Sequence, residues 1–361
     1  MSRSNRMPLC CIAPPDLLGR LATEPGAGPE QREAAIRALA TSASMRTQRA
    51  MIGRLCRELN LSVGQVTGLG LTTQRRLTVY TNQNRGRFFL PGVRMRGWGE
   101  PPVPDQAVNE AYDGSAATFD FYRDVFGRDS IDGAGLELVS TVHYGADFDN
   151  AFWNGAQMIY GDGSGQIFQV GALTRSLDII AHELTHGVTE FTAGLVYSKQ
   201  SGALNEHFSD VVGSLVKQYS LNQTADQADW LIGEGTLVPL LGTALRSMRE
   251  PGTAFRGDRQ PKHMDDYVDL PDDNDPRNDN GGVHINSGIP NHAFYLAATA
   301  LGGHAWEVAG KIWYTALTEV IRPDTQFDEA AHATVKVAGN LFGNGEQSAI
   351  REAWEAVGVL P

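Results

Sequence analysis

Two histidines and a glutamate in one short segment are the residues of this sequence whose types and spacing could do chemistry together. His182, Glu183 and His186 lie in IIAHELTHGVTEF, residues 179–191. On a helix, positions four apart share a face, so the two imidazoles can point at one cation. Glu183 can then reach a water molecule held by that cation. The segment by itself leaves two interpretations open, a hydrolytic metal site or a helix that happens to carry two histidines.

A catalytic zinc ion takes three protein ligands and keeps one position open, so a third ligand should lie on a nearby element. Glu206 begins the next predicted helix, in SGALNEHFSD. Alone it would more readily be a solvated carboxylate at a helix start; together with the two histidines it is predicted to be the third ligand. Asp210 lies one turn further on the same face and can accept the outer N–H of a ligating imidazole. Asn205 is assigned to the same supporting layer.

The predicted elements change in type near residue 176. Residues 60–175 combine β-branched and aromatic residues with Gly, Asn and Asp turns, which predicts strands in RRLTVYTN, RFFLPGVRM, LELVSTVHYG and AFWNGAQMIYGDGSGQIFQV, and one helix around residues 107–127. Beyond this point apolar residues recur at helical spacing, and Ser176 is a possible N-cap of the histidine helix. Further helices are predicted in GALNEHFSDVVGSLVKQYS, NHAFYLAATALGG, HAWEVAGKIWYTALTEVI and GEQSAIREAWEAVG.

These patterns predict an α+β fold with two lobes, the first rich in strands and the second mainly helical, with the histidine helix at their junction. Residues 1–50 differ from both lobes: a PPDLL segment and a Gly/Pro loop precede an alanine-rich helix that begins at Pro29. We therefore divide the chain into a prosegment (1–50), a strand-rich catalytic lobe (51–192) and a helical lobe (193–361). The alternative is that the N-terminal segment is an accessory helix of the main domain.

Composition and charge exclude several classes of protein. The formal net charge of −12 makes nucleic acid an unlikely partner, because an acidic surface repels phosphates. No apolar run is long enough to cross a membrane. The N-terminus lacks the sustained apolar stretch of a secretory signal peptide, so export would need another route, and a cytoplasmic location is the alternative. All three cysteines lie in the first 60 residues, which excludes a disulfide scaffold for the main body.

Several blocks, in order along the chain, together resemble one family. HELTHGVTEFTAGLVYSKQSGALNEHFSD, NAFWNGAQMIYGDG and DNGGVHINSG resemble the thermolysin family of zinc metalloendopeptidases. The short prosegment with PPDLL resembles the protealysin-like branch of that family, whose precursors carry a compact propeptide. The resemblance extends from about residue 105 to the C-terminus and implies the two-lobed thermolysin-like fold.

The catalytic roles follow from this resemblance, residue by residue. Zinc would be bound by His182, His186 and Glu206, and Glu183 would take a proton from the water on the zinc. Tyr197 and His284 would donate hydrogen bonds to the oxyanion. Asp279 would orient His284 and favour its charged form.

The resemblance also implies how a peptide substrate is held. Asn150 and the carbonyl of Ala151 would bind the substrate backbone as an added edge strand, and Arg246 would clamp the carbonyl just beyond the cleaved bond. An apolar pocket for the residue after the cut would be lined by Leu173, Ile179 and Leu245, which implies cleavage on the amino side of hydrophobic residues. Taken singly, Arg246 could be a surface ion-pair residue, Tyr197 a packing residue, Asn150 a turn former and His284 a structural histidine.

The sequence departs from the family where a pair of calcium ions often binds. Asp178, Asp229 and Glu234 match acidic positions of that site, but two further positions are Lys217 and Leu231. Because the lysine can supply the positive charge that a cation would bring, we expect the double calcium site to be lost and Lys217 to replace it with ion pairs. One calcium ion or none is expected.

The prosegment is expected to act as an intramolecular inhibitor. Cys10 and Cys11 precede IAPPDLL, so one hypothesis is that a thiolate caps the zinc; the alternative is that proline-rich packing alone blocks the cleft. Self-removal is expected near residues 44–51, where Met45 and Met51 suit the apolar pocket.

The resulting prediction is a latent, secreted zinc endopeptidase that acts as a monomer on protein or peptide substrates. A narrower version is a zinc peptidase with only a few protein targets. From a different class, the chain could be a catalytically silent zinc-binding or inhibitory module. Glu183, Tyr197 and His284 argue against that module, because metal binding alone requires none of them.

Overall fold

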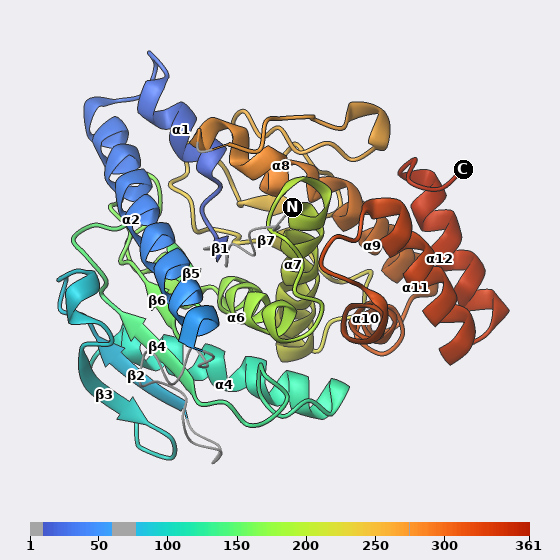
Figure 1. Ribbon diagram of the computed structural model, residues 1–361, viewed down its shortest axis with the longest axis horizontal. Coiled ribbons are helices and arrows are strands. Elements are labelled where there is room, and N and C mark those ends of the chain that lie inside the picture. The colour runs from blue at the N-terminus through green and yellow to red at the C-terminus, as the bar shows by residue number, and fades with distance from the viewer. Residues whose placement is uncertain (1–9, 60–76, 274) are drawn as a thin grey trace.

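The computed structural model describes residues 10–59, 77–273 and 275–361 (Figure 1). Within these ranges the strands gather in the first half of the chain, and helices dominate beyond residue 176. This confirms the predicted α+β fold with a strand-containing N-terminal region and a mainly helical C-terminal region. None of the described helices has the length and apolar character needed to cross a bilayer.

Six of the described strands form one sheet in the order β1-β5-β6-β4-β2-β3. The strands β2, β4 and β6 run parallel to one another, whereas β5 is antiparallel to both of its neighbours and β3 is antiparallel to β2. The edge strand β1 belongs to the predicted prosegment, so the N-terminal segment completes the sheet. The bounds are Cys10–Cys11 (β1), Leu77–Thr81 (β2), Val93–Gly97 (β3), Leu138–Val142 (β4), Ala151–Trp153 (β5) and Met158–Tyr160 (β6).

Two of the predicted strands are wrong in part. The first half of RFFLPGVRM forms a 3-10 helix, Arg87–Phe89, and the strand begins only at Val93. Pro91 separates the two, and a proline has no N–H to donate to a ladder. In GQIFQV the structure has a single bridge, between Phe168 and Leu237, and no strand.

The helices α6 (Leu177–Phe191) and α7 (Lys199–Leu221) pack side by side at the junction of the two regions (Figure 1). Gly213 of α7 permits this close approach, because a Cβ atom there would lie 2.7 Å from the carbonyl oxygen of Asp178. Ser176 stands at the N-cap position of α6 but does not cap it with its side chain; its hydroxyl bonds the Asp178 carboxylate instead. The helix α4 (Gln106–Phe126) packs on both α6 and the sheet.

The C-terminal region contains the predicted helices and two more, α8 (Asp279–Asn286) and α11 (Phe327–Leu341). The helix α11 was not predicted, because its buried face is built largely from alanine, which gives a weak apolar pattern. The helical segments are Asp279–Asn286 (α8), Gly288–Leu301 (α9), Ala309–Thr315 (α10), the π-helical Ala316–Val320, Phe327–Leu341 (α11) and Asn344–Ala356 (α12). Shorter elements are α5 (Ala172–Arg175), the hairpin of β7 (Leu231–Ile232) and β8 (Arg246–Ser247), and two 3-10 turns at Met264–Asp266 and Pro276–Asn278.

The prosegment contacts both regions of the molecule. It forms α1 (Pro15–Thr23) and then α2 (Pro29–Leu59), which begins at the predicted proline. The helix α1 packs on the turn Pro276–Asn278, whereas α2 runs beside the strand-rich region (Figure 1). Because α2 continues past residue 50, the predicted boundary at that position falls inside a continuous helix, and the boundary itself stays a prediction.

Candidate functional site

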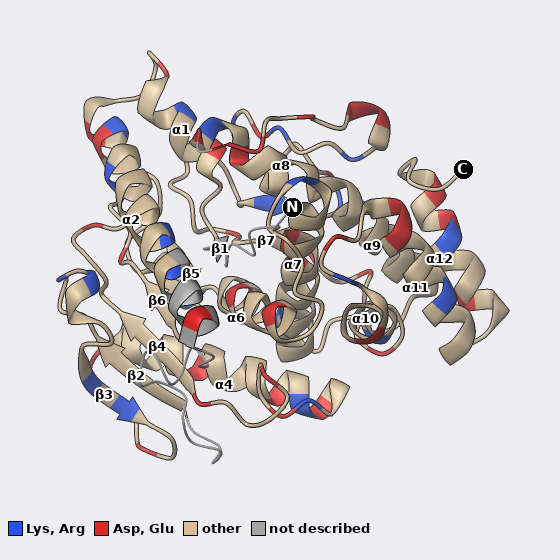
Figure 2. Cartoon of the chain, viewed as in Figure 1, with Lys and Arg blue, Asp and Glu red and all other residues tan. Residues whose placement is uncertain are grey.

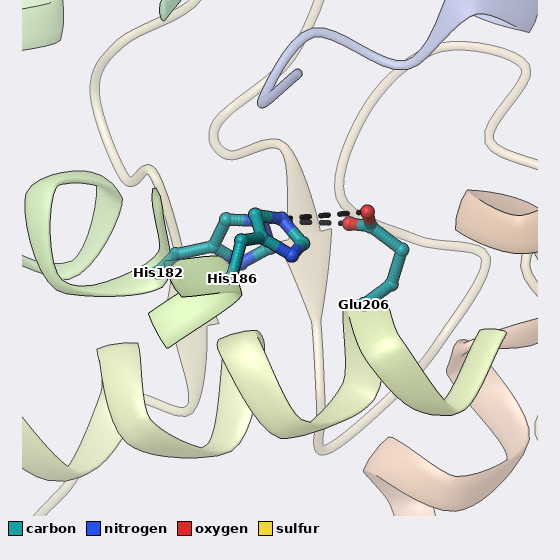
Figure 3. Close-up of side chains that lie close together, drawn as sticks. All are labelled: His182, His186 and Glu206. Carbon is teal, nitrogen blue, oxygen red and sulfur yellow. Dashed lines mark hydrogen bonds and ion pairs between the residues drawn. The ribbon is translucent and has the colours of Figure 1, made fainter. Parts of the chain in front are cut away.

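Three buried side chains from α6 and α7 converge on one point. The ligand atoms of His182, His186 and Glu206 all lie within 4.8 Å of one another (Figure 3). Glu206 Oε2 is 3.4 Å from His182 Nε2, and Glu206 Oε1 is 3.5 Å from His186 Nε2. The structure therefore brings together the two histidines and the glutamate that the sequence selected.

The hydrogen bonds behind the imidazoles fit a shared cation. His182 Nδ1 lies 2.8 Å from Asp210 Oδ1, and His186 Nδ1 lies 2.7 Å from Asn205 Oδ1. With both Nδ1 atoms donating, the two Nε2 atoms present lone pairs only 3.0 Å apart, beside a carboxylate. Two lone pairs held this close need a positive charge between them. Two imidazoles and one carboxylate are a donor set that suits catalytic zinc.

Glu183 lies next to this group without belonging to it. Its Oε2 accepts a 3.0 Å hydrogen bond from the backbone N–H of Trp153, and its buried Oε1 has no hydrogen-bond partner among the described residues. Burial raises the pKa of Glu183 to about 8. One oxygen thus fixes the side chain, and the other remains available to a further donor.

Asp210 connects the ligands to the rest of the helical region. It accepts bonds of 2.7 and 2.9 Å from Arg246 Nε and Nη2 and one of 2.8 Å from Asn291 Nδ2. Burial raises the pKa of this carboxyl, but the charges of Arg246 and His182 outweigh burial and hold the pKa well below its usual range. Asp210 therefore remains an anion that can fix the ring of His182.

The sequence did not single out the chain of hydrogen bonds behind Asp210. Trp313 Nε1 donates to His207 Nε2 at 2.7 Å, and His207 Nδ1 in turn lies 2.8 Å from Asn291 Oδ1. Because the tryptophan donates, the Nδ1–H of His207 must point at Asn291, which fixes the amide that bonds Asp210. In the sequence, the only indications of this hydrogen-bond chain were that His207 follows the predicted ligand Glu206 and that Asn291 lies in an otherwise apolar helical segment.

The expected oxyanion donors also meet at the Glu206 carboxylate, and His284 Nε2 lies 3.4 Å from its Oε2. The Tyr197 hydroxyl bonds Glu206 and lies 3.4 Å from His284 Nε2. His284 Nδ1 is 2.6 Å from Asp279 Oδ1, and Asp279 Oδ2 also accepts from the His284 backbone N–H at 2.7 Å. Asp279 reaches back in this way because residues 279–282 adopt left-handed φ values, which Gly281 and Gly282 tolerate without strain.

The prosegment backbone occupies the groups assigned to substrate. Ile12 N donates to the Ala151 carbonyl at 3.1 Å, and Ala13 N donates to Asn150 Oδ1 at 3.0 Å. The carbonyl oxygen of Cys11 lies 3.0 Å from His284 Nε2. The strand β1 pairs antiparallel with β5, so the prosegment lies in the groove as an added edge strand.

Of the two cysteines, the structure describes the side chain of Cys11 only. Its thiol bonds Ser42 of α2, is fully buried with a pKa raised by burial to about 12, and is not among the atoms that converge on the metal position. The Cys11 carbonyl thus contacts His284, whereas the Cys11 sulfur lies close enough to Glu183 and Glu206 to feel their charges without joining the three converging atoms, so a role of this thiol in capping the metal stays a prediction. The side chain of Cys10 lies outside the described residues, so its proposed role stays a prediction.

The remaining predicted substrate residues are buried near this groove. Arg246 is 1% exposed and pairs with Asp210, so it is no surface ion-pair residue, and its Nη1 has no hydrogen-bond partner among the described residues. The apolar residues predicted to line the pocket are all fully buried: Leu173, Ile179 and Leu245.

Lys217 meets the three acidic residues at the N-terminal end of α6. Its Nζ lies 2.6 Å from Asp229 Oδ2, 3.5 Å from Asp178 Oδ2 and 4.0 Å from Glu234 Oε2. It also donates to the Leu231 carbonyl at 3.4 Å. Burial lowers the pKa of this ammonium, but the neighbouring carboxylates outweigh burial and raise the pKa overall. The predicted ion pairs of Lys217 are therefore present.

Comparisons with known proteins agree with this geometry. Residues 65–190 match the family described as the thermolysin metallopeptidase catalytic domain, and residues 193–359 match its alpha-helical domain. An extracellular metalloprotease of Pectobacterium carotovorum subsp. carotovorum is 52% identical over 277 residues, which is 75% of this chain and 78% of that protein. Protease PrtS of Photorhabdus sp. (strain Az29) is 47% identical over 289 residues, 78% of this chain and 76% of that protein.

A solved structure extends the likeness to the prosegment. The precursor of protealysin, a metalloproteinase from Serratia proteamaculans, superposes with a TM-score of 0.82 at 43% sequence identity, covering 97% of this chain and 99% of that one. This coverage includes the N-terminal segment, which the two family matches leave out. The chain belongs to the thermolysin family of metallopeptidases and is a metalloendopeptidase.

Proposed function

We propose that this metalloendopeptidase is a zinc enzyme that cuts peptide bonds on the amino side of hydrophobic residues and is made as a latent precursor. The observation that carries the proposal is the position of the prosegment backbone. Three consecutive residues, Cys11, Ile12 and Ala13, contact the very groups assigned to a substrate: His284, the Ala151 carbonyl and Asn150. The prosegment therefore mimics a bound peptide.

The register of the prosegment on β5 indicates which prosegment residue stands at which position of a substrate. The Cys11 carbonyl takes the place of the carbonyl that is attacked, and Ile12 takes the place of the residue after the cut. Ile12 is fully buried. An apolar side chain at this position gains about 25 cal/mol for each Å² that it removes from water, which supports a preference for hydrophobic residues there.

The side chains around the groove have separable roles in hydrolysis. Glu183, held by the Trp153 N–H, takes a proton from the attacking water through its open oxygen. Tyr197 and His284 donate hydrogen bonds to the carbonyl oxygen as it becomes negative, and each such donor is worth about 3 kcal/mol. Asp279 positions His284 so that Nε2 faces the peptide. Arg246 offers its unpaired Nη1 to the next carbonyl.

The group of His182, His186 and Glu206 would hold the zinc ion. When bound, zinc supplies the Lewis acidity that makes a water nucleophilic near neutral pH. Asp210 and Asn205 keep the two imidazoles in the tautomer that such an ion requires. A catalytically silent binding module would not need Glu183, Tyr197 or His284, and all three are in place.

Latency follows from occupation of the groove. In the precursor His284 is engaged by the Cys11 carbonyl, and the next two residues, Ile12 and Ala13, occupy the Ala151 carbonyl and Asn150. Release requires cleavage and loss of the prosegment, which we assign to a self-processed bond near residues 44–51. Cys10 remains a candidate ligand that could cap the metal in the precursor.

We further propose that calcium binding is reduced to one ion or none. Lys217 already supplies a positive charge to Asp178, Asp229 and Glu234, which supports the loss of the double site. One relative of this chain is named an extracellular metalloprotease. We infer that this chain is likewise exported and acts as a monomer on protein or peptide substrates.

A comparison of precursor and mature protein tests the proposal. Purified precursor and processed enzyme are assayed on casein and on peptides with Leu, Phe, Asp or Lys after the target bond, with zinc and calcium content measured by mass spectrometry. We expect one zinc per chain, activity only in the processed form, and cleavage before Leu and Phe. Full activity of the intact precursor, or equal cleavage before Asp, would contradict it.

A further inference from the structure

A second part of the prosegment, the helix α2, also contacts the catalytic region. Arg49, on α2, is only 3% exposed. Such burial is unusual for an arginine, and this one belongs to the segment that we expect to be cleaved off. Basic positions recur along α2 where it runs beside β5 and α6 (Figure 2). Arg49 reaches from this helix into the body of the enzyme, and its contacts there resemble those of a bound ligand.

Four features of the enzyme surround the guanidinium. Arg49 Nη2 lies 2.6 Å from Glu190 Oε2, and Nη1 donates to the Trp153 carbonyl at 2.9 Å. The indole Nε1 of Trp153 donates to the same Glu190 oxygen at 3.2 Å, which holds the carboxylate in place. Gly155 forms the wall, since a Cβ atom there would lie 3.2 Å from Arg49 Nη1.

This guanidinium site belongs to the enzyme and adjoins its groove. Trp153 ends β5, the strand on which the prosegment lies as a substrate mimic, and Cys10 pairs with Trp153. With Cys11 at the position just before the cut, Trp153 stands opposite the second residue before it. The site thus lies on the amino-terminal side of the cleaved bond, within reach of the second or third residue.

We infer that, once the prosegment has left, Glu190 and the Trp153 carbonyl select substrates with arginine at the second or third position before the cleaved bond. This inference rests on the proposed cleavage before hydrophobic residues and adds a specificity-determining residue to it. It also rests on processing before Met51, which removes Arg49 with the prosegment. The planar guanidinium fits because it can bond a carboxylate and a carbonyl at once.

Peptides that differ in one side chain test the inference on the processed enzyme. A quenched fluorescent series keeps Leu after the cleaved bond and carries Arg, citrulline, Gln or Glu at the second or third position before it. Citrulline has the shape of arginine without the charge. We expect kcat/KM for the Arg peptide to exceed that for the citrulline peptide by about tenfold, the effect of one charge-assisted pair.

The matched variants are Glu190→Gln, Glu190→Asp and, as a control, Glu352→Gln, which removes an exposed carboxylate of α12. The Arg-to-citrulline ratio should fall to near one in Glu190→Gln, stay above one in Glu190→Asp and be unchanged in the control. An equal ratio in the wild type, or a preference that survives in Glu190→Gln, overturns the inference. A mature N-terminus that retains Arg49 also counts against it.

The same series separates this inference from the proposed function. If the enzyme cuts the Gln and citrulline peptides before Leu but shows no preference for Arg, only the role of Glu190 fails. If none of the peptides is cut before Leu, the proposed cleavage preference fails first.

Discussion

Two clusters of carboxylates lie along the same pair of helices, and they obtain their positive charge in different ways. Glu206, which lies about two turns into α7 and not at its start as predicted, faces two imidazoles in the middle of α6 whose Nε2 atoms are 3.0 Å apart. At the N-terminal end of α6, Asp178 faces Lys217, which also pairs with Asp229. The first cluster needs a cation from outside, whereas the second carries its cation on a side chain.

Because of this difference, the two clusters should respond differently to the removal of metal ions. An ion held by imidazoles and a carboxylate can be removed, and its neighbours are then left with close lone pairs and a buried charge. An ammonium on a lysine cannot be removed by a chelator. We therefore expect zinc to control activity at the first cluster and calcium to have little effect on the second.

The largest expected effect is at the first cluster. Glu206→Gln replaces a charged ligand by a neutral amide, so the variant should lose zinc and its peptidase activity should fall to the limit of detection. Metal content by mass spectrometry and hydrolysis of a Leu peptide check this. Glu352→Gln is the control; a Glu206→Gln protein with full zinc content and activity would break the comparison.

A smaller but still large loss of activity is expected when Glu183, beside the metal-binding residues, is replaced. Glu183→Gln keeps an oxygen for the Trp153 N–H but cannot take a proton, so kcat should fall by about 10²–10⁴-fold while zinc stays bound. The precursor of this variant should also remain unprocessed. Loss of zinc together with activity would show that Glu183 helps to hold the metal instead.

At the second cluster the expected effect is on stability. Lys217→Met leaves the buried Asp178 without its ion pair and should lower the free energy of unfolding by about 2 kcal/mol. Urea unfolding, in a Glu183→Gln background to prevent self-digestion, measures this with and without calcium.

The lysine can also be replaced by an acid. Lys217→Glu should make stability depend on calcium, whereas the protein with Lys217 should show little response to calcium. A large calcium response with Lys217 in place would mean that the two clusters do not differ as proposed.

The smallest effect concerns alkaline pH. In the folded protein burial lowers the pKa of Lys217, but the carboxylates of Asp178 and Asp229 outweigh burial and raise the pKa overall. Its contribution is therefore complete below the unfolded value of 10.5 and is lost as pH rises through the higher folded value. The stability difference between the protein with Lys217 and Lys217→Met should stay constant from about pH 7 to 9 and shrink above about pH 11. A difference that shrinks between about pH 7 and 9 would contradict this.

Much of the metal group could be predicted because its pattern is local. Spacing on one helix puts His182 and His186 on one face, and the next helix offers Glu206 and Asp210 one turn apart. The supporting residues from distant segments were missed: Asn291 and Trp313 meet Asp210 and His207 only after the helical region has packed. The pairing of Arg49 with Glu190 was missed for the same reason, since the two residues are joined only by tertiary structure.

The sequence by itself determined the types of the candidate metal-binding residues and the succession of strand-rich and helical regions. Helical periodicity and residue chemistry decide these within a few turns of chain. Only the tertiary structure decided what lies in the groove: the Cys11 backbone carbonyl at His284, with the thiol turned to Ser42. The register of β1 on β5 sets that choice, and a register between distant strands depends on how the whole prosegment packs across both regions.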